Sequence, residues 1–121
     1  MFLVTTNKAK GLLHVSYIGH VTVAELRRNR SDVVALLAEM PAGFKALVAL
    51  GRLDSMDTDC VEELGKIMEL FDQHGLKQVA RVIPDSSKDI GFNILARFHY
   101  HHNLRITNCK TMVEAAKLLS L

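Results

Sequence analysis

The residues best suited to chemistry lie in one short polar segment, residues 51–60 (GRLDSMDTDC). It holds three carboxylates, two hydroxyls and a cysteine, but no base and no glycine-rich phosphate cradle. Since a serine, threonine or cysteine nucleophile needs a base beside it, this composition favours recognition over catalysis and predicts no catalytic residue. The candidate regulatory or partner-binding residues are Ser55, Asp57, Thr58, Asp59 and Cys60.

The residues on either side of this segment predict how it is positioned. Residues 44–50 (FKALVAL) have the composition of a buried strand. After the segment, apolar residues recur at helical spacing from Val61 to Phe71, so a helix is expected there. The polar segment should therefore be a loop at the carboxyl end of a strand, where open α/β folds usually bind their ligands.

Size and composition exclude several classes of protein. With 121 residues, 49% of them hydrophobic, the chain should form a single domain over 1–121. Its net charge of +2 and 6% aromatic content provide no coherent basic face with stacking platforms, which argues against nucleic-acid binding. No apolar run approaches the roughly 20 residues of a membrane span, and the first residues do not resemble a signal peptide. A cytoplasmic location is expected.

Alternating strands and helices predict an α/β fold. Residues 2–6 and 12–20 should form a β-hairpin, with Leu13, Val15, Tyr17 and His20 on one side of its second strand. The predicted fold is a five-stranded, mostly parallel sheet with this N-terminal hairpin and four helices, in the order β-β-α-β-α-β-α-β-α. Helix starts are predicted at Thr22 and 58–59, after 84–87, and at Thr111; the later strands are predicted at 44–50, 77–83 and 104–107.

Three further groups of residues could carry chemistry. His99 and His102 lie one helical turn apart, but no acidic residue lies near them in sequence, so no metal site is predicted. Ser86 and Ser87 should lie at the same sheet edge as the polar segment, where they could cap the third helix or form a pocket wall. The two cysteines, Cys60 and Cys109, have no metal-type spacing, and no cofactor is expected.

Two stretches resemble the STAS domain of anti-sigma-factor antagonists and of small STAS-like bacterial proteins. Residues 53–60 (LDSMDTDC) resemble the family's L-S-x-M-D-S-S-G segment, and residues 111–119 (TMVEAAKLL) resemble its closing T-x-x-E-A-x-x-x-L. The resemblance implies a STAS-like fold and a non-enzymatic regulatory module. Its implied partner is a kinase-like anti-sigma factor or a related regulator.

In that family the second hydroxyl of the D-S-S-G part of this segment is phosphorylated by a partner kinase. The resemblance places Asp59 at this phosphoacceptor position and Cys60 at the glycine position. Because Asp cannot accept phosphate from such a kinase, the switch is fixed at this position, absent, or moved to Thr58 or Ser55.

Two other interpretations are open. Asp59 with Glu62 could be a capping box with no regulatory role. A small-molecule or lipid-binding STAS-like domain is the alternative function, with a small apolar ligand beneath the third helix near Phe92, Phe98 and Tyr100.

Overall fold

The computed structural model describes residues 1–83 and 104–121. Its elements follow in chain order. They are β1 (Phe2–Asn7), the 3₁₀ turn η1 (Lys8–Lys10), β2 (Leu12–Val21), α1 (Val23–Ala38), β3 (Lys45–Met56), α2 (Cys60–Gln73), β4 (Gln78–Val82), β5 (Arg105–Cys109) and α4 (Met112–Leu118). No helix in the described ranges is long and apolar enough to cross a membrane.

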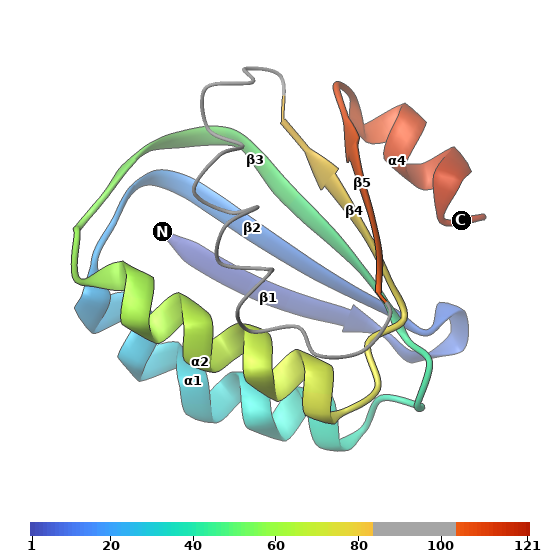
Figure 1. Ribbon diagram of the computed structural model, residues 1–121, viewed down its shortest axis with the longest axis horizontal. Helices are drawn as coiled ribbons and strands as arrows, with labels where there is room; N and C mark the ends of the chain where they lie inside the picture. Colours follow the sequence, from blue (N-terminus) through green and yellow to red (C-terminus); the bar gives the residue numbers. More distant parts are fainter. Residues whose placement is uncertain (84–103) are drawn as a thin grey trace.

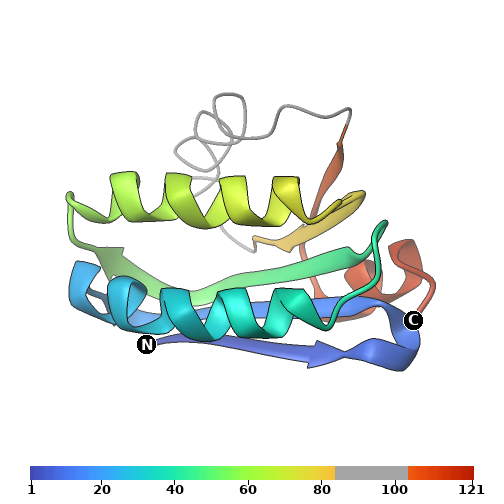
Figure 2. The ribbon, with the colours of Figure 1, turned by 90° about the horizontal axis from the view of Figure 1, so that it is seen from below.

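The five strands form one sheet in the order β1-β2-β3-β4-β5. β1 and β2 are antiparallel, whereas the three following pairs are parallel. Helices α1 and α2 lie side by side along one face of the sheet, and α4 lies on the other face (Figures 1 and 2). The predicted α/β class and hairpin are confirmed, while the sheet is mixed rather than mostly parallel, because its first pair runs antiparallel.

The alternation along β2 separates the two faces. Leu13, Val15, Tyr17 and Val21 are buried in the core that the sheet shares with α1 and α2. His14, Ser16 and Ile18 between them are only half-buried and face the α4 side, whereas His20 is exposed. A one-residue change of register would exchange the two sets, so this alternation fixes the strand's orientation.

The predicted signals at the start of α1 and at the end of α2 are confirmed. The Thr22 hydroxyl accepts a hydrogen bond from the Glu25 amide, and the Glu25 carboxylate accepts one from the Thr22 amide, which completes a capping box at the start of α1. At the end of α2, Gly75 has φ +88, a left-handed conformation that most side chains disfavour. The chain can therefore turn directly into β4.

Helices α1 and α2 are also joined by charge. Glu63 of α2 is almost fully buried and accepts hydrogen bonds from Arg27 and Arg30 of α1 and from Lys66 of its own helix. Burial alone raises the pKa of this carboxyl. The Arg27 hydrogen bond, together with the Lys66 and Arg30 charges, outweighs burial and lowers the pKa overall.

One expected helix is not tested by the described residues, and two expected strand ends differ from the structure. The described residues contain three α-helices, and the predicted helix after 84–87 lies outside them. β3 runs to Met56 instead of ending at residue 50, because the polar residues after Gly51 still pair with β2. The last strand spans Arg105–Cys109 instead of 104–107.

Candidate functional site

The carboxyl ends of β2 and β3 carry the candidate residues as strand rather than loop. Register shifts between Ser16 and Ile18 and between Gly19 and His20 let β3 contribute extra residues to the pairing. Gly19, at the second of these shifts, has φ +66, a left-handed backbone conformation that glycine adopts more easily than other residues. The shifts place His20 directly opposite Ser55.

His20 joins a serine to a carboxylate. Its Nδ1 lies 2.6 Å from the Ser55 Oγ, and its Nε2 lies 2.8 Å from the Asp57 Oδ1. Because an ionised carboxylate only accepts, a neutral His20 places its proton on Nε2 and leaves Nδ1 to accept from the Ser55 hydroxyl. The imidazole and carboxylate side chains are 49% and 41% exposed, so the three groups lie open to solvent. The expectation that the polar segment has no base beside it is therefore wrong.

Asp57 forms hydrogen bonds with both connections that leave this sheet edge, the one from β2 to α1 and the one from β3 to α2. Its amide donates to the Val21 carbonyl at 3.1 Å, and its own carbonyl accepts from the Cys60 amide at 3.0 Å. Its Oδ2 lies 3.4 Å from the Val23 amide, in the first turn of α1. A carboxylate is favoured there by the helix dipole. These bonds hold Asp57 at the starts of α1 and α2, and Asp57 in turn fixes the orientation of His20.

Thr58 and Asp59 are exposed at the start of α2, as predicted. The capping interpretation is wrong for Asp59, because its side chain makes no capping hydrogen bond and its backbone is already helical (φ −71, ψ −11). Beside it, the apolar side chain of Val61 is 55% exposed, and the Glu62 carboxylate is largely exposed. An acidic and partly apolar surface results.

Cys60 does not belong to this surface. It is fully buried, and its Sγ lies 3.6 Å from the Val21 carbonyl oxygen, to which the thiol donates. Burial, with smaller contributions from Asp57 and Asp59, raises the pKa of the thiol above its ordinary value. Burial likewise raises the pKa of Cys109. Both thiols therefore stay protonated at neutral pH, and Cys60 is a core residue rather than a partner-binding one.

An open groove of about 500 Å³ lies on the α4 side of the sheet. Its walls are mainly apolar and include Ile18 of β2, Ala49 of β3, Val82 of β4 and Met112 of α4. The cationic residue Arg52 also lines it, directly opposite Ile18. Beyond this pair along the strands, His20 lies two residues further on β2 and Ser55 three residues further on β3, across a register shift.

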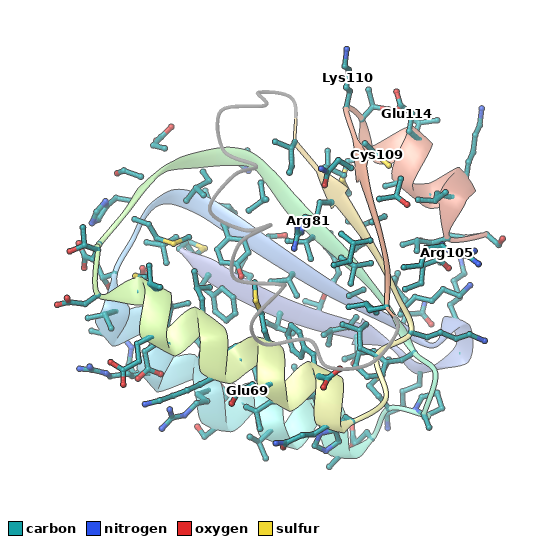
Figure 3. The ribbon with its side chains drawn as sticks, viewed as in Figure 1. Glu69, Arg81, Arg105, Cys109, Lys110 and Glu114 are labelled. Atoms are coloured by element: carbon teal, nitrogen blue, oxygen red, sulfur yellow. The ribbon has the colours of Figure 1, made fainter. Side chains whose placement is uncertain are left out.

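Lys110 is the second cationic residue of the groove. It extends from the carboxyl end of β5, next to the buried Cys109 (Figure 3). Another hollow, of about 580 Å³, lies at the opposite edge of the sheet and is lined by Lys45, Lys77 and Arg105. One of these cations, Lys45, donates to the Leu119 carbonyl and so helps to hold the end of α4.

Several candidates lie outside the described residues: Ser86, Ser87 and the His99–His102 cluster. Within the described ranges, no group of three or more His, Cys, Asp and Glu side chains is placed to hold a metal ion.

Sequence reasoning missed the role of His20. It was expected on the side of Leu13, whereas Val21 is the residue that continues the buried side beyond Tyr17. The partners of His20 lie 35 and 37 residues away, and only the pairing of β2 with β3 brings them together. The usable signal was position: a histidine at the end of a strand that neighbours the polar segment.

Comparisons with known proteins agree in fold. No known family's sequence model matches the chain, and no curated protein sequence does. An uncharacterised DUF3478-family protein from Shewanella loihica with a SpoIIAA-like fold matches with a TM-score of 0.75 at 13% identity, over 98% of this chain and 92% of that one. The anti-sigma factor antagonist SpoIIAA in its unphosphorylated form matches with 0.65 at 15% identity, over 99% and 98%.

A third match is the Bacillus cell fate determinant SpoIIAA in its phosphorylated form, with a TM-score of 0.64 at 14% identity, over 98% and 99% of the two chains. The resemblance to the STAS domain is therefore confirmed at the level of the fold. The chain has a STAS-like, SpoIIAA-like fold over almost its whole length.

Proposed function

We propose that the protein is a non-enzymatic regulatory module that binds a partner protein through the start of α2. The observation that carries this proposal is the acidic surface formed by Thr58, Asp59, Val61 and Glu62, here called the α2 surface. Its side chains are exposed, and the Asp59 carboxylate is not used to cap the helix. Support from the fold comes from SpoIIAA, an anti-sigma factor antagonist of similar structure.

The charge of the α2 surface indicates the kind of partner. Asp54, Asp57, Asp59 and Glu62 lie within nine residues of a chain whose net charge is +2, so the negative charge is concentrated at this edge. Complementary charge steers partners and selects among them. The exposed Val61 supplies an apolar contact at the centre of this acidic rim. The partner should present a basic surface with an apolar pocket, as a kinase-like regulator could.

Asp59 would set the regulatory state. A phosphoserine at a helix start carries nearly two negative charges at neutral pH, whereas Asp carries one and offers fewer acceptor oxygens. The α2 surface is then held in an intermediate, partly phosphate-like state that no kinase can reset at this position. Thr58 and Ser55 are the nearby hydroxyls to which a switch could have moved.

Affinity capture from the native cell extract tests the proposal. The wild type, Asp59→Lys and Val61→Arg would be compared with Asp32→Lys, which reverses an exposed acidic charge on α1. A partner retained by the wild type and Asp32→Lys but lost by both α2-surface variants supports the proposal. Equal retention by all four proteins would contradict it. Asp59→Lys should unfold with the wild-type midpoint, because exposed substitutions seldom change stability by more than about 0.5 kcal/mol.

Incubation of the protein with the same extract and ATP, followed by mass spectrometry, tests the fixed state. No phosphate on the wild type and one phosphate on Asp59→Ser would support it. Stoichiometric phosphate on Thr58 or Ser55 would show that the switch has moved.

The small-ligand alternative placed its ligand beneath the third helix near Phe92, Phe98 and Tyr100, which lie outside the described residues. The described residues form a different apolar groove, beside α4. Its volume lies within the range of small-molecule sites. The groove lies on the face of the sheet that α1 and α2 do not cover.

A further inference from the structure

We propose that Ser55 is a base-activated nucleophile that accepts an acyl group from an aliphatic ester, with His20 as the base, Asp57 as the positioning residue and the groove beside α4 as the site for the acyl chain. This goes beyond binding of a partner protein.

The hydrogen-bond chain supplies the first half of the argument. Ser55, His20 and Asp57 are joined at 2.6 and 2.8 Å, within the range required of a nucleophile and its base. Compared with the triad of serine hydrolases, the two nitrogens exchange roles, because here Nδ1 faces the serine and Nε2 the carboxylate. The roles themselves are unchanged: Asp57 fixes the tautomer in which the other nitrogen can take the serine proton.

Asp57 is held in turn, which separates this cluster from an accidental surface contact. Its second oxygen accepts from the Val23 amide, and its backbone is bonded to Val21 and Cys60. A carboxylate fixed in this way restricts the imidazole to one orientation. Orientation of the base is what a positioned nucleophile requires.

The chain contains an internal comparison. Ser16 also lies next to a histidine, with its Oγ 3.4 Å from His14 Nε2, two residues away on the same strand. That pair has a longer contact, and no carboxylate is bonded to the histidine in the part of the chain that the structure describes. Burial also lowers the pKa of His14, which makes it a weaker base. Ser55 should therefore react and Ser16 should not.

The groove supplies the second half of the argument. Its apolar walls suit an aliphatic chain, and its lining includes the pair formed by Ile18 and Arg52, which lies two residues before His20 on β2 and three residues before Ser55 on β3. No hydrogen bond or ion pair of the Arg52 side chain is found among the described residues. Its charge can therefore attract the polar end of an ester while the chain lies along Ala49 and Met112.

The reaction balances with the ester as sole co-reactant. The Ser55 Oγ forms a bond to the carbonyl carbon while its proton passes to His20 Nδ1. The bond from that carbon to the leaving oxygen then breaks, and the proton moves from His20 to the leaving alcohol. The products are an acyl ester on Ser55 and a free alcohol, one of each per chain.

Two chromogenic probes test the proposal on the full chain: p-nitrophenyl octanoate and p-nitrophenyl acetate. The wild type should release one equivalent of nitrophenol from the octanoate and gain one acyl group on Ser55 by peptide mass spectrometry. Ser55→Ala should lose the acylation, whereas the control Ser31→Ala, an exposed serine on α1 outside the groove, should keep it. Acylation that persists in Ser55→Ala, or that is found on Ser16, overturns the proposal.

The base is tested by rescue. His20→Ala should acylate at least tenfold more slowly, since a positioned base usually contributes about 10²-fold or more. Added imidazole should restore part of the rate in His20→Ala but not in Ser55→Ala, an effect that a structural role would not produce. Asp57→Asn should also be slower, and Asp57→Glu, which keeps a carboxylate, should recover part of the rate. A wild-type rate in His20→Ala contradicts the assignment.

The groove is tested by chain length. Met112 lines the groove and is 45% exposed at the start of α4, so Met112→Asp should fold normally while placing a charge in the groove. It should lower the rate with octanoate several-fold and leave the rate with acetate unchanged. An unchanged ratio of the two rates would overturn the groove as the acyl site. Continued release beyond one equivalent, lost in Ser55→Ala, would support the nucleophile and contradict only the non-enzymatic part of the proposed function.

Discussion

The two faces of the sheet differ in how completely they are covered. On one face, α1 and α2 bury Leu13, Val15 and Tyr17 in the main core. On the other, the seven-residue α4 covers the β4 and β5 side, and His14, Ser16 and Ile18 of β2 line an open groove. The difference indicates that the two faces have different roles. The covered face provides most of the stability. The open face and the strand ends beside it have exposed side chains that are available for binding and reaction.

The largest expected effect comes from adjacent leucines on β2 that face opposite ways. Leu13 is fully buried in the main core, whereas Leu12 is half-buried beside the smaller cluster under α4. Leu13→Ala should cost about 3 kcal/mol, within the usual range for a buried leucine, and Leu12→Ala about 1 kcal/mol. Urea unfolding measures both. Equal losses would show that the two faces contribute equally and would remove the basis of the comparison.

A smaller effect should come from Glu63, which joins the two helices of the covered face. Glu63→Gln should cost about 1–3 kcal/mol at neutral pH, because it weakens hydrogen bonds between charged groups. The pKa of this carboxyl is lowered in the folded protein, so its contribution is full above the ordinary carboxyl pKa and is lost as the pH falls through the folded value.

Urea unfolding of wild type and Glu63→Gln across the acidic range provides the measurement. The difference between the two proteins should shrink as the pH falls below about 4. A difference that is constant with pH would show that packing, not charge, makes Glu63 important. Glu62→Gln is the matched control, since its carboxylate is largely exposed on the same turn.

The smallest effects concern the helix caps on the two faces. Thr22 at α1 takes part in a reciprocal capping box, whereas the Thr111 hydroxyl accepts from the Glu114 amide and the Glu114 carboxylate accepts from the Lys110 amide instead. Thr22→Ala should cost about 1 kcal/mol, and Thr111→Ala about 0.5 kcal/mol, at the low end for caps. Thermal unfolding of the two variants distinguishes them. A larger loss at Thr111 would show that α4 contributes more than its short length suggests.

Local patterns in the sequence determined most of the elements. The alternation in residues 12–18 indicated a strand with one buried side, the Thr22–Glu25 and Thr111–Glu114 spacings indicated helix starts, and Gly75 indicated a helix end. Each of these signals acts within a few residues, through side-chain alternation or through hydrogen bonds to the nearby backbone. For that reason they can be recognised without knowledge of the rest of the fold.

Tertiary structure decided the site. The polar composition of residues 51–56 favoured a loop, yet pairing with β2 keeps them in a strand, because neighbouring backbone groups satisfy one another regardless of side-chain polarity. Asp59 had the sequence of a cap but lies in a helical conformation that leaves its carboxylate exposed. The contact of His20 with Ser55 and Asp57 depends on the register shifts between β2 and β3. Register is a property of two strands together, so neither strand's sequence contains it alone.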